Sequence, residues 1–348
     1  RTMSRTSVEE DQTDKAARQA GGEFVRGVSA YRTTIEADDV EAGRYHLYIG
    51  YNCPWCHRVA LARAVLGLES AISMDVLLPT RTEEDHPEGE GKWQFAPEGI
   101  TGRNGSVVKF DECTADTVSG LGTVIEIYRT FGRDDKEKAE KSVPLLFDKK
   151  TKRIVNNESS EIVRMLETSF RPLCAASAPD LYPASLAKEI GETNELTYAA
   201  INNGAYKAGF SSKQAVYEAA FAAYFAAFDK LEAVLAEQRW LCGETVTEAD
   251  LRLFPTIFRH DPVYHNRMKL NQAFVADYPH LWRWMCDFYA LPGVAAASPL
   301  DHMKQGYFGR TGNGTVPIGP KGYPELLHDR DYAARRAARA GKRKHEGE

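Results

Sequence analysis

The sequence predicts an α/β domain followed by an all-α domain, and three observations lead to this prediction. Cys53 and Cys56 form a Cys-x-x-Cys pair between residues 45–49, an apolar run that predicts a strand, and residues 59–67, which predict a helix that ends at a glycine. Strand and helix patterns then alternate as far as residue 166. Beyond residue 182 the apolar spacing is helical, and no strand pattern of comparable strength follows.

Cys53 is expected to be the reactive member of the pair. Pro54 fits the first turn of a helix, where a missing N–H costs no hydrogen bond, so Cys53 lies at the helix N-terminus. The free N–H groups and the positive helix end there stabilise a thiolate and lower the pKa of cysteine. A strand, a Cys-x-x-Cys pair and a helix are typical of thioredoxin-like redox domains.

Two other interpretations of the pair are half of a zinc site and two inert buried cysteines. The sequence has no second Cys or His pair with the spacing of zinc ligands, so no metal is expected. Inert cysteines would be the commoner case without the proline and the strand–helix context.

The segments after the first helix predict the rest of a small sheet. Residues 72–78 predict a strand that ends at Pro79. Residues 79–110 are rich in glycine, proline and charge, which predicts a long functional loop. The apolar spacing over residues 117–131 predicts a helix.

A hairpin and a further helix complete the first domain. Residues 143–148 and 154–155 predict its two strands. Asn, Ser and Glu residues over 156–161 satisfy the free N–H groups at the start of a helix that extends through Leu166.

The second domain is expected to be helical. Thr247 and Asp250 resemble a capping box, with Asp in the usual position of Glu. The expected helices cover residues 186–203, 212–238, 248–259 and 278–290.

The length of 348 residues allows two domains, each with its own core. A basic C-terminal segment is expected to be solvated, with a nuclear signal or an anchor to an anionic surface as alternatives. The expected divisions are an N-terminal arm (1–30), an α/β domain (31–170), a linker (171–182), an all-α domain (183–328) and a basic tail (329–348).

Composition excludes several classes of partner. The net charge of −5 argues against nucleic acid, and no apolar run is long enough to span a membrane. Six scattered cysteines do not form a disulfide framework, and the N-terminus lacks an apolar signal core, so a cytoplasmic protein is expected. The first residue is not Met, which leaves open a processed N-terminus and an organelle.

Several segments together resemble the Xi class of glutathione transferases, the glutathionyl-hydroquinone reductases. Any one of them is a weak match, but their joint order from about Phe24 to Pro320 is specific. The resemblance implies the glutathione transferase fold, glutathione as co-substrate and a homodimer. The matching segments are residues 52–55, 143–148, 157–166, 202–210, 241–254, 261–264 and 316–320.

The resemblance implies how the middle of glutathione is held. The first cysteine of the motif, here Cys53, attacks in this family, and the loop tryptophan, here Trp93, packs on glutathione. Pro144 corresponds to the cis-proline of the thioredoxin fold. A cis bond turns the backbone of Val143 towards the cysteinyl part of the ligand.

The two ends of glutathione are assigned in the same way. Glu158 and Ser159 would hold the γ-glutamyl end, where a carboxylate faces the ammonium group and a helix start faces the carboxylate. Relatives use a basic residue before the proline strand, usually Arg, for the glycine carboxylate. Lys141 is the candidate here, although lysine offers a point charge and not a bidentate fork.

The acceptor pocket of the family is built from tyrosines of the helical domain. Tyr206 and Tyr307 match by motif, and Tyr264 and His302 are further candidates whose alternative is simple core packing. A phenol can hydrogen-bond a quinol oxygen or deliver a proton. Gly306 stands where relatives often have His, a departure expected to weaken proton delivery or open the pocket.

Cys56 is the largest departure, because Xi relatives commonly have Ala there. At i+3 on the helix it is within reach of Cys53, so it is either a resolving thiol or a small buried helix residue.

The resemblance implies a reductase that removes glutathione from glutathionyl-hydroquinones through a Cys53–glutathione mixed disulfide. Two alternatives stay open at this point. One is an Omega-type dithiol thioltransferase or dehydroascorbate reductase that uses Cys53 and Cys56. The other is a non-catalytic carrier of quinones or other aromatic ligands.

Overall fold

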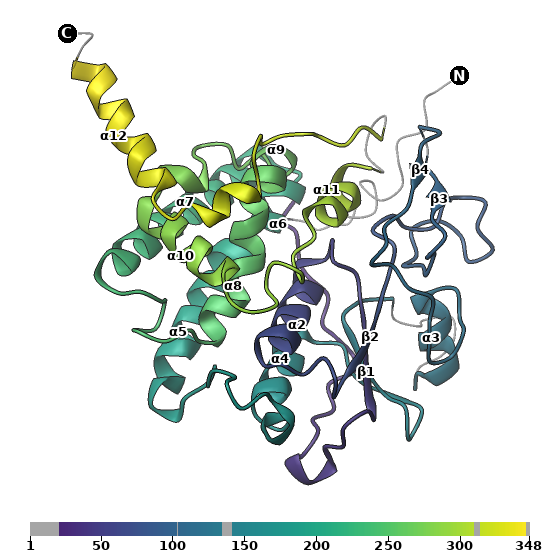
Figure 1. Cartoon of the computed structure of the whole chain (residues 1–348). Coiled ribbons are helices and arrows are strands. Elements are labelled where there is room, and N and C mark those ends of the chain that lie inside the picture. Colours follow the sequence, from purple (N-terminus) through teal and green to yellow (C-terminus); the bar gives the residue numbers. More distant parts are fainter. Residues whose placement is uncertain (1–20, 103, 134–140, 310–313, 346–348) are drawn as a thin grey trace. The chain divides into compact units, whose positions relative to one another are not determined.

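A computed structural model describes residues 21–102, 104–133, 141–309 and 314–345 (Figure 1), so most of the predicted N-terminal arm lies outside the described residues. Contacts divide the chain into two compact units. Unit 1 comprises Arg26–Ala178 and Ala296–Pro317, and unit 2 comprises Pro179–Ala295 with the flanking segments 21–25 and 318–345. Residues 296–317 therefore group with the α/β part of the chain, whereas the predicted divisions place them in the helical domain.

Unit 1 is built on a four-stranded sheet in the order β2-β1-β5-β6. Strand β1 pairs with β2 in parallel and with β5 antiparallel, and β5 pairs antiparallel with β6. Every residue of β1 and β5 is buried, because helices α2 and α4 cover one face and α3 the other (Figure 1). The elements are β1 (Tyr45–Ile49), α2 (Pro54–Val65), β2 (Ser73–Val76), α3 (Val124–Phe131), β5 (Leu145–Asp148), β6 (Arg153–Asn156) and α4 (Ser159–Glu167).

The helix predicted over residues 117–131 is shorter than expected, since α3 begins at Val124. The Asp116 carboxylate accepts hydrogen bonds from the backbone N–H groups of three of the next five residues, at 3.0–3.1 Å. Such local bonds stabilise a loop in competition with a helix. The helix starts only after Thr123, whose hydroxyl caps it.

The segment predicted as a long loop, residues 79–110, contains a small hairpin, β3 (Ile100–Thr101) and β4 (Val107–Val108). An apolar cluster of Leu78, Val108 and Cys113 lies beneath it, with Ile100 and Phe110 packed against the cluster. The insert therefore has a small core of its own. Another element that the sequence did not predict is α11 (Leu300–Phe308), which belongs to unit 1.

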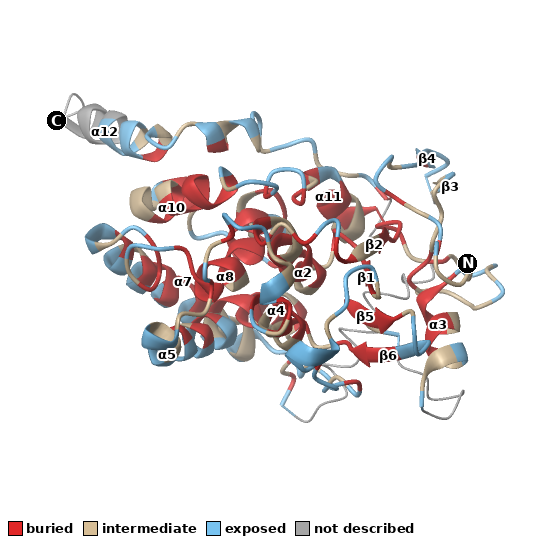
Figure 2. Cartoon of the chain, turned by 60° about the horizontal axis from the view of Figure 1, so that its bottom comes forward, coloured by how far each residue is buried: buried red, intermediate tan, exposed pale blue. Residues whose placement is uncertain are grey.

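Unit 2 is helical, as predicted. Helix α8 is its centre, because Arg252 alone of its twelve residues is not buried (Figure 2). The single helix predicted over 186–203 is instead α5 and a π-helix, which lead into α6. The elements are α5 (Ala187–Thr197), a π-helix (Tyr198–Asn202), α6 (Gly204–Phe210), α7 (Gln214–Glu237), α8 (Glu248–Arg259), a π-helix (His260–Tyr264), α9 (His265–Arg267), α10 (Pro279–Tyr289) and α12 (Tyr332–His345).

The basic tail is more ordered than expected, because it forms α12. Ala333 is fully buried, the ring of Tyr332 lies 5.3 Å from that of Trp282, and Arg336 pairs with Asp277 at 3.1 Å. The next described side chains up to residue 338 are mostly exposed, as predicted for a solvated segment.

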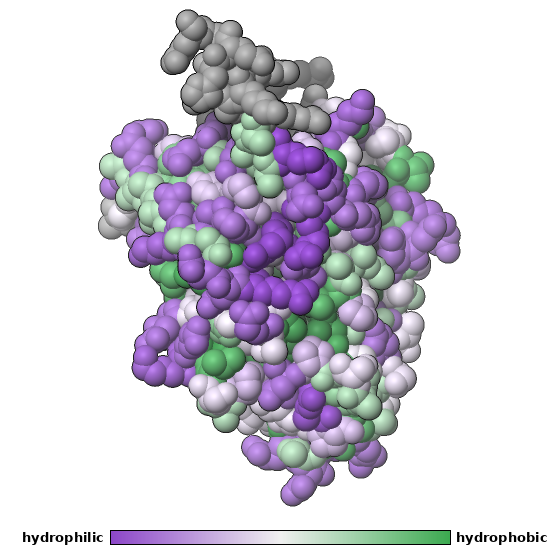
Figure 3. Space-filling view, turned by 60° about the vertical axis from the view of Figure 1, so that its left-hand side comes forward, coloured by the Kyte–Doolittle hydropathy of each residue, from purple (hydrophilic) through white to green (hydrophobic). Residues whose placement is uncertain are grey.

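The face shown in Figure 3 is mainly hydrophilic, with separate apolar areas. Within the described parts of the chain, none of the helices combines the length and the hydropathy that crossing a bilayer requires.

Asp250 is predicted to be a main source of stability in unit 2. It completes the capping box with Thr247, as expected, and its buried carboxylate also accepts hydrogen bonds from Leu241 N–H at 2.9 Å and Trp284 Nε1–H at 2.8 Å. Replacing Asp250 by Ala leaves these buried donors without an acceptor, so the free energy of unfolding should fall by roughly 3–5 kcal/mol. Calorimetric melting of Asp250→Ala beside Asp38→Ala, an exposed control, measures this; equal melting temperatures would contradict it.

Candidate active site

Cys53 is the N-cap residue of α2, with Pro54 at the first helical position, as predicted. Its backbone is held on both sides, since Cys53 N–H donates to Gly50 O at 2.9 Å and Cys53 O accepts from His57 N–H at 3.0 Å. The residue is partly exposed, and its sulfur lies 3.8 Å from Val143 O. The strand–turn–helix unit therefore places the thiol beside the segment that leads into β5.

The pKa of the Cys53 thiol is lowered to about 6. Burial opposes this shift, but the Cys56 thiol donates a hydrogen bond to the Cys53 sulfur, and backbone N–H groups of the first helical turn do the same. The positive charge of Arg81 lowers the pKa further. At neutral pH the group is thus mainly a thiolate, the form in which cysteine is a nucleophile.

The pKa of each of the other five cysteines is raised, and burial is the largest cause in every case. These residues are Cys56, Cys113, Cys174, Cys242 and Cys286. All six are free thiols. Cys56 is completely buried and stays protonated, which makes it a hydrogen-bond donor to the Cys53 sulfur.

The Val143–Pro144 peptide is cis, as the resemblance implies. The preceding residue, Ser142, is held by two hydrogen bonds, from Tyr128 OH to Ser142 O at 2.9 Å and from Asn157 Nδ2 to Ser142 Oγ at 3.1 Å. Because Asn157 directly precedes Glu158, this network ties the start of β5 to the start of α4.

Glu158 is the N-cap of α4 and Ser159 is its first residue. The Glu158 carboxylate accepts from Ser160 N–H at 3.2 Å and from Ser29 Oγ at 3.2 Å, so it already acts as a helix cap. Ser159 is buried. The contacts of these two residues with glutathione remain a prediction.

Trp93 and Arg81 form a stacked pair beside the Cys53 turn. Trp93 is only 6% exposed, and the Arg81 Cζ lies 3.0 Å from the centroid of its ring. Sequence reasoning missed Arg81. It lies in the long loop that was predicted to be functional, but that loop carries many charges and no local pattern distinguishes one of them.

Lys141, the predicted partner of the glycine carboxylate, is exposed two residues before Val143. Nothing among its described contacts tests its role, which remains a prediction.

The predicted acceptor residues fall into both units. Unit 1 holds His302 and Tyr307 on α11, together with Cys53. Unit 2 holds Tyr206 and Tyr264, whose rings are 6.4 Å apart. Tyr264 is fully buried and Tyr206 is 8% exposed. Their part in an acceptor pocket stays a prediction.

His302 lies inside unit 1. Its Nε2 is 3.2 Å from Glu112 Oε2, and its ring is 4.3 Å from that of Phe110. Burial lowers the pKa of His302, although Glu112 opposes the shift. These contacts hold α11 against the insert.

Gly306 allows α11 to lie close to Asn52, the residue that precedes Cys53. A Cβ atom added to Gly306 would lie 2.4 Å from Asn52 Cβ, which is closer than any real contact. The residue before Tyr307 therefore lies against the residue before Cys53. A histidine at position 306 would collide with Asn52 in this arrangement.

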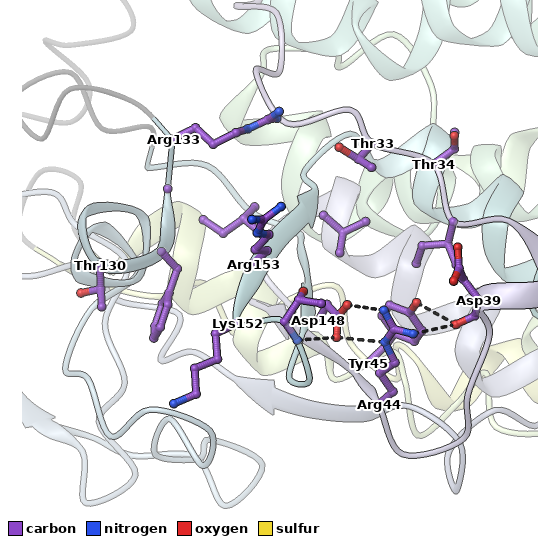
Figure 4. Close-up of a pocket in the computed structure, with 16 residues that line it drawn as sticks. Thr33, Thr34, Asp39, Arg44, Tyr45, Thr130, Arg133, Asp148, Lys152 and Arg153 are labelled. Atoms are coloured by element: carbon purple, nitrogen blue, oxygen red, sulfur yellow. Dashed lines mark hydrogen bonds and ion pairs between the residues drawn. The ribbon is translucent and has the colours of Figure 1, made fainter.

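A cavity of about 570 Å³ lies at the strand ends of the unit 1 sheet that are remote from Cys53 (Figure 4). It is lined by the chain at the start of β1 and β6 and the end of β5, where Arg44 pairs with Asp148 at 2.6 Å. Cys53 follows the other end of β1, so this cavity is separate from the candidate active site. Among the described residues, no three His, Cys, Asp or Glu side chains converge as metal ligands would.

The low pKa of Cys53 predicts selective alkylation. The thiolate fraction rises with pH through about 6, so the rate of Cys53 alkylation by iodoacetamide should be half-maximal near that pH. Cys56→Ala removes a donor to the thiolate and should move the midpoint towards the ordinary cysteine value of about 8.5. Mass spectrometry of the labelled peptide measures both, with Cys113→Ala as control. A wild-type midpoint near that of free cysteine would contradict the prediction.

Comparison with known proteins gives one family match in each of the two units. Residues 52–169 match the model of the glutathione S-transferase N-terminal domain, and residues 214–285 match that of the C-terminal domain. The chain is 38% identical over 308 residues to the glutathionyl-hydroquinone reductase PcpF of Sphingobium chlorophenolicum, covering 87% of this chain and 91% of that protein.

Solved structures of glutathione transferases are also similar to this chain. The glutathione-S-transferase Xi from Phanerochaete chrysosporium matches with a TM-score of 0.76 and 38% identity over 86% of this chain and 98% of that one. The glutathione-bound structure of YqjG from Escherichia coli K-12 matches with a TM-score of 0.76 and 35% identity, over 87% and 96%. The chain belongs to the glutathione transferases, in the Xi class that includes the glutathionyl-hydroquinone reductases.

Proposed function

We propose that this protein is a glutathione-dependent reductase that removes glutathione from glutathionyl-hydroquinones and releases the hydroquinone and oxidised glutathione. The observation that carries the proposal is the lowered pKa of Cys53, the one thiol of the six that is shifted in this direction. The name of the relative PcpF, a glutathionyl-hydroquinone reductase, supports the same substrate class.

The first step captures glutathione. The Cys53 thiolate attacks the sulfur that joins glutathione to the aromatic ring, a disulfide bond forms, and the carbon–sulfur bond breaks. The electron pair of that bond leaves with the ring carbon, which takes up a proton to give the hydroquinone. The ring is thereby reduced, and the two sulfurs are oxidised to the mixed disulfide.

The second step regenerates the enzyme. The thiolate of a second glutathione attacks the glutathione sulfur of the mixed disulfide and releases oxidised glutathione, and Cys53 leaves as a thiolate. A low pKa favours Cys53 in this step too, because a more acidic thiol is the better leaving group.

Proton delivery to the ring carbon is assigned to Tyr307 or Tyr206. The contact of Gly306 with Asn52 supports Tyr307, since these two residues directly precede Tyr307 and Cys53. Tyr264 and His302 are weaker candidates for the acceptor pocket, because both are almost completely buried.

Glutathione is proposed to bind across the strand ends of the sheet that lie beside Cys53. Val143 would pair with its cysteinyl backbone beside Pro144, Glu158 and Ser159 would hold the γ-glutamyl end, and Trp93 would support the ligand. Other aromatic acceptors are proposed for the same pocket. A homodimer and a cytoplasmic location are proposed from the family and from the free thiols.

A dithiol thioltransferase is the second candidate, and the hydrogen bond between Cys56 and Cys53 is the observation that favours it. In this reaction the Cys56 sulfur attacks Cys53 in the mixed disulfide and displaces glutathione. The raised pKa of Cys56 makes this step slow, because its thiolate is scarce at neutral pH. A non-catalytic carrier gives no reason for the lowered pKa of Cys53.

Cys53→Ser should reduce turnover of glutathionyl-menadione to the uncatalysed background, because a hydroxyl forms no mixed disulfide. Release of menadiol, followed by chromatography, measures this. Cys113→Ser is the matched control and should keep wild-type turnover. Wild-type turnover by Cys53→Ser would remove the mechanism.

Cys56→Ser distinguishes the two candidates. The reductase needs Cys53 alone, and the hydroxyl in Cys56→Ser can still donate to the Cys53 sulfur, so turnover of glutathionyl-menadione should continue. A dithiol enzyme would instead lose its activity, and the oxidised wild-type protein would contain a Cys53–Cys56 disulfide by peptide mass spectrometry.

A further inference from the structure

The cavity in Figure 4 is a feature of unit 1 that the proposed reaction does not use. Three parts of unit 1 line it: the chain before β1, the C-terminal end of α3 and the β5–β6 hairpin. The five-residue strand β1 separates it from the Cys53 turn by roughly 16 Å. Its volume of about 570 Å³ lies within the range of small-molecule sites.

We propose that this cavity binds an organic phosphate, with the phosphate group between the guanidinium groups of Arg133 and Arg153 and the organic part on an apolar floor. The assignment does not depend on the proposed function, because no residue of the proposed glutathione site lines the cavity. The described lining residues include no cysteine or histidine, so we assign binding and not catalysis.

Positive charge predominates in the lining of the cavity. Of its cations, only Arg44 forms ion pairs within the described part of the chain. Its Nη2 lies 2.6 Å from Asp148 Oδ2, and its Nε–H donates to Asp148 Oδ1 at 3.0 Å. The charge of Arg44 is thereby balanced, and the other cations exceed the remaining carboxylate. The charged lining residues are Arg44, Arg133, Lys152 and Arg153, against Asp39 and Asp148.

Arg153 has no ion pair among the described residues, because the nearest carboxylate in the sheet is already engaged. Asp148 is directly opposite Arg153 in the β5–β6 register, but it binds Arg44. The same carboxylate also accepts the N–H groups of Lys150 at 2.9 Å and Thr151 at 3.3 Å, which closes the hairpin turn. The exposed guanidinium of Arg153 is therefore left for a ligand.

Arg133 is held in place from the other side of the cavity. Its backbone N–H donates to Tyr31 Oη at 2.9 Å, and its Cζ lies 5.2 Å from the centroid of the Tyr31 ring. Tyr31 is itself buried, with its ring 5.5 Å from that of Tyr128. A cation whose attachment is fixed before the ligand arrives loses less entropy on binding.

Figure 4 shows the guanidinium groups of Arg133 and Arg153 on the same side of the cavity, whereas Lys152 points away from them. Two cations that share a site repel each other, and a dianion between them replaces this repulsion by attraction. A phosphate monoester suits the pair, because each guanidinium donates two parallel hydrogen bonds and the ester has three free oxygens. The carbonyl end of α3 opposes an anion, but Arg133 follows it directly and offsets its partial charge.

The floor of the cavity is apolar, which favours an organic phosphate over the free ion. Phe131 is partly exposed, and its ring packs edge-on against Phe147 at 5.1 Å. One face of a flat apolar group could stack on such a ring while its phosphate reaches the two arginines. The apolar lining residues are Ile35, Tyr45, Phe131, Ile154 and Val155.

Isothermal titration with phenyl phosphate, inorganic phosphate and phenol tests the assignment. We expect phenyl phosphate to bind at one site per chain, roughly tenfold more tightly than inorganic phosphate because of the buried ring. Phenol, which lacks the charge, should not bind measurably. Arg133→Met and Arg153→Met should each weaken binding of phenyl phosphate by roughly tenfold to a hundredfold.

Lys150→Met is the matched control for these variants. It removes an exposed cation from the same hairpin, but Lys150 does not line the cavity and pairs with Glu41 at 2.8 Å. The affinity for phenyl phosphate should therefore stay close to that of the wild type. Arg153→Lys, which keeps the charge, should recover part of the affinity lost in Arg153→Met. Melting temperatures of all variants show that each is folded.

Several outcomes would overturn the assignment. These are no saturable binding of phenyl phosphate, wild-type affinity in both arginine variants, an equal loss in Lys150→Met, and equal affinities for phenyl phosphate and inorganic phosphate. Saturating S-methylglutathione should leave the affinity for phenyl phosphate unchanged. Competition between the two ligands would place phenyl phosphate at the glutathione site and overturn the assignment, whereas failure of S-methylglutathione to bind would count against the proposed function alone.

Discussion

A cysteine that reacts at neutral pH must lose its proton there, and burial opposes this loss because it raises the pKa of the thiol. The five other thiols of this chain show that effect, because the pKa of each is raised. Cys53 differs because it is the N-cap of α2, where free N–H groups and the thiol of Cys56 face its sulfur. The buried β1 strand and the proline that starts α2 hold it there.

The sheet then brings to this thiol the parts of the proposed glutathione site, which are far apart in sequence. Parallel and antiparallel pairing places the ends of four strands at one edge, so a single extended ligand can contact all of them. A carboxylate, Glu158, lies at the end proposed for the ammonium group of glutathione.

Helix α11 carries Tyr307, one of the proposed acceptor residues, within the same unit as Cys53. It is late in the sequence, but its contacts place it in unit 1. Gly306 lets it lie against Asn52, and Gln305 Nε2 donates to Thr80 Oγ1 at 3.3 Å, beside Arg81. The absence of a side chain at Gly306 therefore has a packing consequence, because it lets the residue before Tyr307 contact the residue before Cys53.

The sequence by itself determined the features that depend on neighbours along the chain. These include the strand–Cys53–helix unit, the capping box of Thr247 and Asp250, and the helical second half, because periodicity and capping are local signals. Family motifs added the cis peptide before Pro144. Only the tertiary structure decided that Asp116 shortens α3, that α11 belongs with the sheet, and that Arg81 lies over Trp93. Each of these depends on which side chains from distant segments come into contact, and that follows from packing of the whole unit.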